Sequence, residues 1–233
     1  MSPPRAETKC DLCIVGAGYS GINAFNAAAK YLPRGARVVV VDRGRAWGGQ
    51  WVDQYPYVRL HQPYQSFTCG ERQWPIAGTK PKNHLASKGE ILQYFEDVAA
   101  ACVTEQGLDL SLLFLHAYEP PYAVKAGKVH LTARPLPALG PHAPMVAIEA
   151  ARMIDCKGFN VQVKRPLRFS ATAARINSLC PVDVLTPAWT SLAHYSRDTD
   201  AEIWVIGSGK TAMDVVYHLC RGPAAAAMRS RIR

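Results

Sequence analysis

Residues 10–42 read CDLCIVGAGYSGINAFNAAAKYLPRGARVVVVD, and this stretch decides the fold. The apolar run Cys10–Val15 predicts a strand ending at Gly16, and apolar residues then recur at helical spacing over Ile22–Leu32. The β-branched run Val38–Val41 predicts a second strand. A strand, a glycine turn, a helix and a strand in this order form a βαβ unit, which predicts a parallel sheet with a right-handed crossover.

The turn between the first strand and the helix reads GAGYSG. Its first glycine permits a tight turn, its second lets a pyrophosphate approach the backbone, and its third lets helix and strand pack closely. Asp42 lies 21 residues after Gly21, where an acid binds ribose hydroxyls in dinucleotide-binding folds. The predicted dinucleotide site therefore comprises Gly16, Ala17, Gly18, Tyr19, Ser20, Gly21 and Asp42. The alternative is a glycine turn that binds no ligand.

The middle of the chain predicts loops, one long helix and several short strands. Residues 43–83 are rich in aromatics, glycine and proline, which indicates loop and short helix lining a site. Ser87 and Glu90 form a capping-box pattern and predict a helix over residues 88–105. Strands are predicted at 112–118, 122–125, 128–132 and 145–156, with a hairpin turn at Ala126-Gly127.

The opening pattern returns near residue 201. A strand-like segment at 202–206 leads into GSGKTA, and a helical stripe of apolar residues follows. Gly209-Lys210-Thr211 also matches the end of a phosphate-binding P-loop, but that motif needs glycine where Trp204 stands. We therefore predict a second dinucleotide turn.

The segment after Asp42 resembles flavin-containing and Baeyer–Villiger monooxygenases. The resemblance lies in Asp42-Arg43, in Trp47-Gly48-Gly49-Gln50-Trp51, and in Tyr55-Pro56 followed by Arg59. It implies that FAD contacts also come from Arg43, Gly49, Gln50, Trp51, Arg59 and His61. The NAD(P) contacts it implies are Gly207, Ser208, Gly209, Lys210 and Thr211. The alternative for the aromatic segment is ordinary packing in a buried loop.

The chain also departs from both families. Tyr57 stands where the families have glycine, and His61 lies near the position of their aspartate. The ATG-like turn that joins their two modules corresponds to Cys156-Lys157-Gly158, and the FxGxxxHxxxF motif of flavin-containing monooxygenases is absent. The sequence therefore indicates the broader superfamily, and no catalytic residue is assigned.

The resemblance implies an α/β fold: a doubly wound parallel sheet that binds FAD, a small antiparallel meander at about 112–150, and the start of a second Rossmann-like unit. The expected boundaries are 8–165 for the FAD domain, 166–198 for a linker, and 199–233 for an NAD(P) module that stops unfinished at Arg233.

The implied activity is oxidation of a small organic substrate by dioxygen through a flavin peroxide, with NADPH or NADH as reductant. The alternatives are a non-catalytic truncated paralogue that at most binds FAD, and an NAD(P)H-flavin oxidoreductase without oxygenation.

Composition restricts the remaining function classes. Lys and Arg number 27 against 18 Asp and Glu, a net charge of +9, but the basic residues are mostly scattered, and we expect no nucleic-acid partner. Seven irregularly spaced cysteines and an opening segment without an apolar core favour a cytoplasmic protein.

No apolar run is long enough for a transmembrane segment, and no His or Cys spacing indicates a metal site. Cys10 and Cys13 are expected to be core residues rather than a redox pair, and the oligomeric state is not predicted.

Overall fold

The computed structural model describes residues 5–158, 203–221, 229 and 232. Its strands are β1 (Arg5–Val15), β2 (Arg37–Val41), β3 (Asp109–Leu113), β4 (His116–Lys125), β5 (Lys128–Pro135) and β6 (Met145–Asp155). Its α-helices are α1 (Tyr19–Ala29), α2 (Gln50–Asp53), α3 (Lys88–Gln106) and α5 (Lys210–Arg221), and short 3₁₀ helices lie at Tyr64–Ser66 and Pro137–Leu139. The chain divides into two compact units, residues 1–52 with 62–159 and residues 53–61 with 160–233.

The first unit contains a six-stranded sheet in the order β3-β2-β1-β6-β5-β4. Strands β3, β2, β1 and β6 are parallel to their neighbours, whereas β6 with β5 and β5 with β4 pair in antiparallel fashion. Strand β6 thus belongs to both the parallel sheet and the meander. The predicted α/β fold with a parallel sheet and an antiparallel portion is confirmed.

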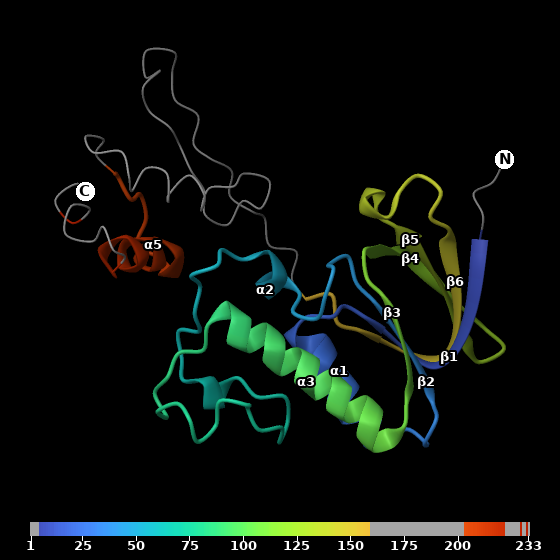
Figure 1. The fold of residues 1–233 in the computed structure, drawn as a ribbon. Helices are drawn as coiled ribbons and strands as arrows, with labels where there is room; N and C mark the ends of the chain where they lie inside the picture. The colour runs from blue at the N-terminus through green and yellow to red at the C-terminus, as the bar shows by residue number, and fades with distance from the viewer. Residues whose placement is uncertain (1–4, 159–202, 222–228, 230–231, 233) are drawn as a thin grey trace, which may run out of the picture. The chain divides into compact units, whose positions relative to one another are not determined.

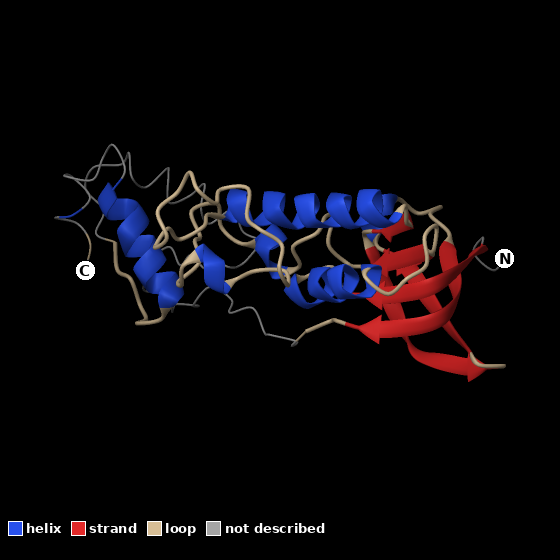
Figure 2. Ribbon diagram, turned by 90° about the horizontal axis from the view of Figure 1, so that it is seen from below, coloured by secondary structure: helices blue, strands red, loops and turns tan. Residues whose placement is uncertain are grey.

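Both faces of β2 and of the end of β1 are covered, which explains the continuous apolar runs Val38–Val41 and Leu12–Val15. One face, with Cys13, Val15 and Val39, packs against Leu131 and Ile148 of the meander strands. Helices α1 and α3 lie side by side in both views, and α1 packs against β1 (Figure 1, Figure 2). The helices and the meander therefore hold the carboxyl end of β1, where the glycine turn begins, between two packed layers.

Helix α3 begins and ends as its sequence predicts. The Ser87 hydroxyl accepts a hydrogen bond from the Glu90 amide, while the Glu90 carboxylate accepts one from the Ser87 amide, completing the capping box. Gly107 ends the helix in the left-handed conformation. The predicted helix is confirmed to within one residue at its end.

One predicted strand was wrong and one hairpin was right. The run 112–118 is broken at Phe114 and Leu115, and Leu115 has a φ of 56°. Its first part belongs to β3, which pairs with β2 in the parallel sheet, and only its second part begins the meander. The hairpin between β4 and β5 turns at Ala126 and Gly127, both with positive φ, as a two-residue turn requires.

No helix among the described residues is long and apolar enough to cross a membrane. The predicted linker, 166–198, lies outside the described residues.

Candidate dinucleotide site

The fold itself requires two of the three glycines in the first turn. Gly16 has a φ of +110°, and a Cβ added there would lie 2.5 Å from the Cys156 carbonyl oxygen. A Cβ on Gly21 would lie 1.9 Å from the Gly16 carbonyl oxygen. Side chains at these positions would push β1, β6 and α1 apart, so packing alone accounts for both glycines.

Packing does not account for the middle glycine. Gly18 has φ −79° and ψ −167°, a conformation open to any residue, and an added Cβ would meet only the Gly49 Cα, at 3.6 Å. Gly49 has a φ of +53°, and its own Cβ would lie 2.8 Å from the Gly18 Cα. The Gly48 amide donates to the Ala17 carbonyl at 2.8 Å and ties the two loops together. The structure therefore brings together glycines that the sequence linked to FAD through separate motifs.

The same turn forms the start of α1 and presents it to the space beside Gly18. Gly18 is the N-cap and offers no side-chain acceptor, and the first turn of the helix contains no acidic residue. The amides of the first helical turn lack partners within the helix and carry the positive end of the helix dipole. Together with two close glycine backbones, this arrangement suits a phosphate group.

Asp42 lies against the turn, at the end of β2. Its carboxylate accepts hydrogen bonds from the Ala17 amide at 2.6 Å and from the Gly44 amide at 2.5 Å. A carboxylate has about four acceptor positions, so two amide bonds leave capacity for ribose hydroxyls. The neighbouring predicted residues Ser20, Arg43 and Gln50 are exposed.

An aromatic cluster flanks the turn. The Tyr19 ring stacks on Phe67 with centroids 4.1 Å apart, and its hydroxyl donates to the Thr68 carbonyl at 2.8 Å. The Trp51 ring meets the same phenylalanine edge-on at 5.9 Å. Burial raises the pKa of Tyr19, which keeps the phenol protonated. Two predicted site residues thus meet at Phe67, which the sequence indicated only through the aromatic richness of its loop.

A polar network fixes the loop that carries Phe67. Arg72 donates to both oxygens of Glu105 at 2.6 Å and to the Asn26 side chain at 2.9 Å. The Tyr94 hydroxyl accepts from the Cys69 amide and donates to the Arg72 carbonyl, both at 2.8 Å. These contacts join the loop to α1 and α3, so the aromatic flank is held by two helices.

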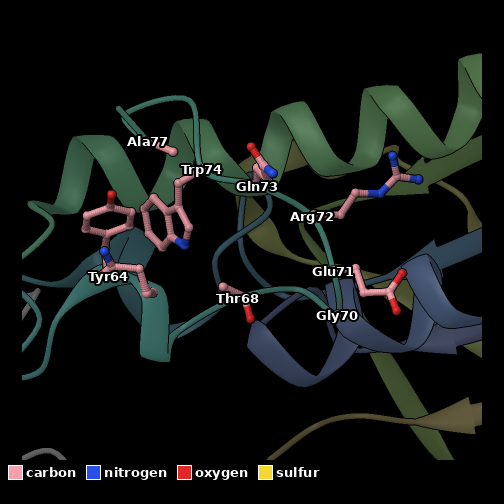
Figure 3. A pocket seen from close by; sticks show the side chains of 9 residues that line it. Tyr64, Thr68, Gly70, Glu71, Arg72, Gln73, Trp74 and Ala77 are labelled. Atoms are coloured by element: carbon pink, nitrogen blue, oxygen red, sulfur yellow. The ribbon is translucent and has the colours of Figure 1, made fainter. Parts of the chain in front are cut away.

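The loop also borders a hollow of about 350 Å³. Its lining residues are Tyr64, Gln65, Thr68, Gly70, Glu71, Arg72, Gln73, Trp74 and Ala77 (Figure 3). None of them is a predicted site residue. The Trp74 indole nitrogen is covered and has no hydrogen-bond partner among the described residues, so a ligand in the hollow would not reach it without a rearrangement.

The second glycine turn belongs to the second unit and lacks its predicted strand. Of the predicted strand 202–206, the described residues 203–206 show only an isolated parallel bridge between Ile203 and Ile232. The helix after the turn is present as α5, and a Cβ on Gly207 would lie 3.8 Å from that of Ala212. The prediction of a strand here was wrong, whereas the predicted helix is confirmed.

The YPY segment packs on α5 within the second unit. The Tyr55 hydroxyl donates to Asp214 at 2.6 Å, and the Lys210 ammonium donates to the same carboxylate oxygen at 2.5 Å. The Tyr57 ring stacks on His218 with centroids 4.1 Å apart. Burial lowers the pKa of His218, which favours the neutral imidazole. Sequence reasoning missed Asp214, because nothing local links it to a tyrosine 159 residues away.

The remaining predicted residues differ in their placement. Arg59 and His61 belong to the second unit and are exposed, and their contact with FAD stays a prediction. Thr211 is half-buried on α5, while Ser208 and Gly209 are exposed.

The buried thiols show no redox or metal arrangement in the described part of the chain. Burial raises the pKa of Cys10 to about 11 and that of Cys13 to about 12, so both are thiols in the core. The described residues contain no cluster of three or more His, Cys, Asp or Glu side chains suited to a metal ion.

Comparison with known proteins relates the chain to a known fold. No family model matches the sequence. Uncharacterized proteins of Mycobacterium bovis and Mycobacterium tuberculosis are 38% identical over 101 residues, which are 41% of this chain and 18% of the relatives.

Two solved structures share the fold at low identity. A polycyclic ketone monooxygenase from the fungus Thermothelomyces thermophila gives a TM-score of 0.61 at 19% identity, covering 95% of this chain and 35% of that enzyme. A cyclohexanone monooxygenase from Rhodococcus sp. Phi1, bound to NADP+, gives 0.55 at 18% identity, covering 91% and 37%. The predicted likeness to flavin-dependent monooxygenases is confirmed at the level of the fold.

Proposed function

We propose that this chain is an FAD-dependent, NAD(P)H-using oxidoreductase of the monooxygenase type, acting on a small organic substrate with dioxygen. The observation that carries the proposal is the contact between Gly18 and Gly49 beside the start of α1. In this proposal residues 8–165 bind FAD and residues 199–233 begin the NAD(P)-binding module.

The residues of the first turn fit FAD. At Gly18 the absence of a side chain has no explanation in the backbone conformation or in the packing, whereas a pyrophosphate between α1 and the Gly49 loop would need that space. The site also holds an acid, Asp42, directly beside the turn. A glycine turn without a ligand would not require glycine at position 18, whereas Asp42 also has a structural role through the Ala17 and Gly44 amides.

Each part of the site has a role in holding the cofactor. The amides of Tyr19, Ser20 and Gly21 would donate to the pyrophosphate, and the Asp42 carboxylate would accept from the adenosine ribose. Trp51, fixed against Phe67, would exclude water from the edge of the site. Bound FAD would supply hydride uptake from NAD(P)H and the activation of dioxygen, while the protein supplies position and shielding.

Two measurements test the proposal. The purified 233-residue chain should bind FAD, seen as flavin absorbance that remains with the protein through gel filtration. A protein that stays colourless after incubation with excess FAD would refute the assignment.

The reaction class is tested by product counting. An oxygenase yields about one oxidised product molecule for each NADPH consumed, whereas an NAD(P)H-flavin oxidoreductase without oxygenation passes all electrons to hydrogen peroxide or an added acceptor. A flavin-loaded protein that consumes no NADPH would favour the non-catalytic alternative.

A further inference from the structure

Asp214 accepts two donors at one oxygen. The Lys210 ammonium lies 2.5 Å and the Tyr55 hydroxyl 2.6 Å from Oδ2. The Lys210 and Asp214 side chains are only 35% and 20% exposed, so the pair is partly shielded from water. The lysine therefore has a defined position rather than a free, solvated one.

The direction of the lysine side chain matters for the glycine turn that precedes it. Lys210 is the first residue of α5, and Asp214 lies one turn further along the helix. One helical turn spans about 5.4 Å, so the ammonium is drawn along the helix and away from its start. A dinucleotide phosphate would bind at that start, where the helix amides point.

We propose that Asp214 is a positioning residue: its carboxylate binds the Lys210 ammonium and keeps it away from the phosphates of the nicotinamide dinucleotide. This inference rests on the proposed function of the second glycine turn. Binding then involves an exchange, in which the Lys210 ammonium leaves the carboxylate for a phosphate oxygen. Asp214 thereby limits the affinity of the module for its reductant.

Tyr55 makes this exchange possible. Tyr55 is 3% exposed, and burial together with the bond to Asp214 raises the pKa of its phenol, so the phenol remains a donor. When Lys210 leaves, the carboxylate still accepts the Tyr55 hydrogen bond and is not left without a partner. An unpaired, partly buried carboxylate would otherwise oppose the exchange.

A double-mutant cycle tests the inference on the 233-residue chain. NADP+ affinity is measured by isothermal titration for the parent, Asp214→Asn, Lys210→Met and the double variant. Asp214→Asn keeps the size of the side chain and removes its charge. We expect it to tighten NADP+ binding about two- to five-fold, the range that partly exposed ion pairs are worth. In the Lys210→Met background the same substitution should change affinity less than about 1.5-fold.

Chemical labelling gives a readout that does not depend on the dinucleotide. Acetic anhydride should modify Lys210 faster in Asp214→Asn than in the parent, with the other lysine-containing peptides as internal reference. Tyr55→Phe serves as the matched control, because it removes a competing donor and should leave Lys210 at least as protected as in the parent.

The outcomes separate this inference from the proposed function. The inference is overturned if Asp214→Asn changes NADP+ affinity equally in the parent and in the Lys210→Met variant, or if Lys210 labelling is unchanged. NADP+ binding by the parent would still support the proposed dinucleotide role of the second turn. A parent that binds no NADP+ at all removes the second turn from the proposed function, and the inference with it.

Discussion

Substituting Gly18 by valine separates ligand binding from folding. The backbone at this position is extended, which suits a β-branched residue, and the new Cβ would lie at an ordinary contact distance of 3.6 Å from Gly49. We therefore expect the free energy of unfolding to change by no more than about 1 kcal/mol. Urea titration followed by circular dichroism measures it.

The effect on FAD should be much larger. The valine methyl groups would occupy the space beside the first-turn amides of α1, and each charge-assisted hydrogen bond lost there costs about 1.5–3 kcal/mol. Losing two such bonds weakens binding by more than about a hundredfold. Titration of the apoprotein with FAD, followed by flavin fluorescence, gives the affinity.

The matched control is the same substitution at Gly209 in the second turn, where an added Cβ meets nothing within 4 Å. Gly209→Val should leave FAD affinity unchanged and slow flavin reduction by NADPH. A folded Gly18→Val protein with parental FAD affinity would show that the first turn does not bind the pyrophosphate.

Three further predictions concern the same unit. Asp42→Ala should weaken FAD binding by about 1.5–3 kcal/mol in the fluorescence titration, and unchanged affinity would exclude its ribose contact. Gly21→Ala should destabilise the fold by about 1–3 kcal/mol or more in urea titrations, because its Cβ would lie 1.9 Å from the Gly16 carbonyl oxygen; a variant as stable as the parent would contradict this packing argument. Burial raises the pKa of Glu90, but hydrogen bonds from Ser87 and His84 outweigh it, so the pKa lies below the usual 4.5. The folded state thus binds the Glu90 proton more weakly than the unfolded chain, so the stability that ionised Glu90 contributes should be present above pH 4.5 and be lost as the pH falls further. Ser87→Ala should reduce this pH dependence of stability. An acid-unfolding profile identical to that of the parent would refute the role of the capping box.

The sequence predicts those elements whose signals are local. The first βαβ unit, helix α3 with its capping box, and the hairpin at Ala126 are each encoded in one contiguous stretch of sequence, and the structure has all of them. The strand at 112–118 was misassigned because apolar character continues through Phe114 and Leu115, although the backbone turns there. Periodicity does not reveal a change of strand partner.

The sequence singled out the glycines of the candidate site but not the residues that position them. Two separate motifs pointed to Gly18 and Gly49, and their contact was found only in the structure. The place of Phe67 depends on a loop whose position is set by Arg72 and Tyr94 across the fold. The long-range bond from Tyr55 to Asp214 has no sequence signal at all. Features fixed by tertiary packing were therefore the ones that sequence reasoning missed.

Strand β6 has a consequence for how the chain folds. It pairs with β1 along the full length of both strands, and Cys13 of β1 lies opposite Met153, about 140 residues later. At ribosomal rates of about 5–20 residues per second, β6 is synthesised roughly 7–28 seconds after β1. During that time one edge of an apolar strand is open to pairing with other chains. Early helix and hairpin formation cannot close that edge, so the nascent polypeptide should depend on chaperones until β6 has left the ribosome.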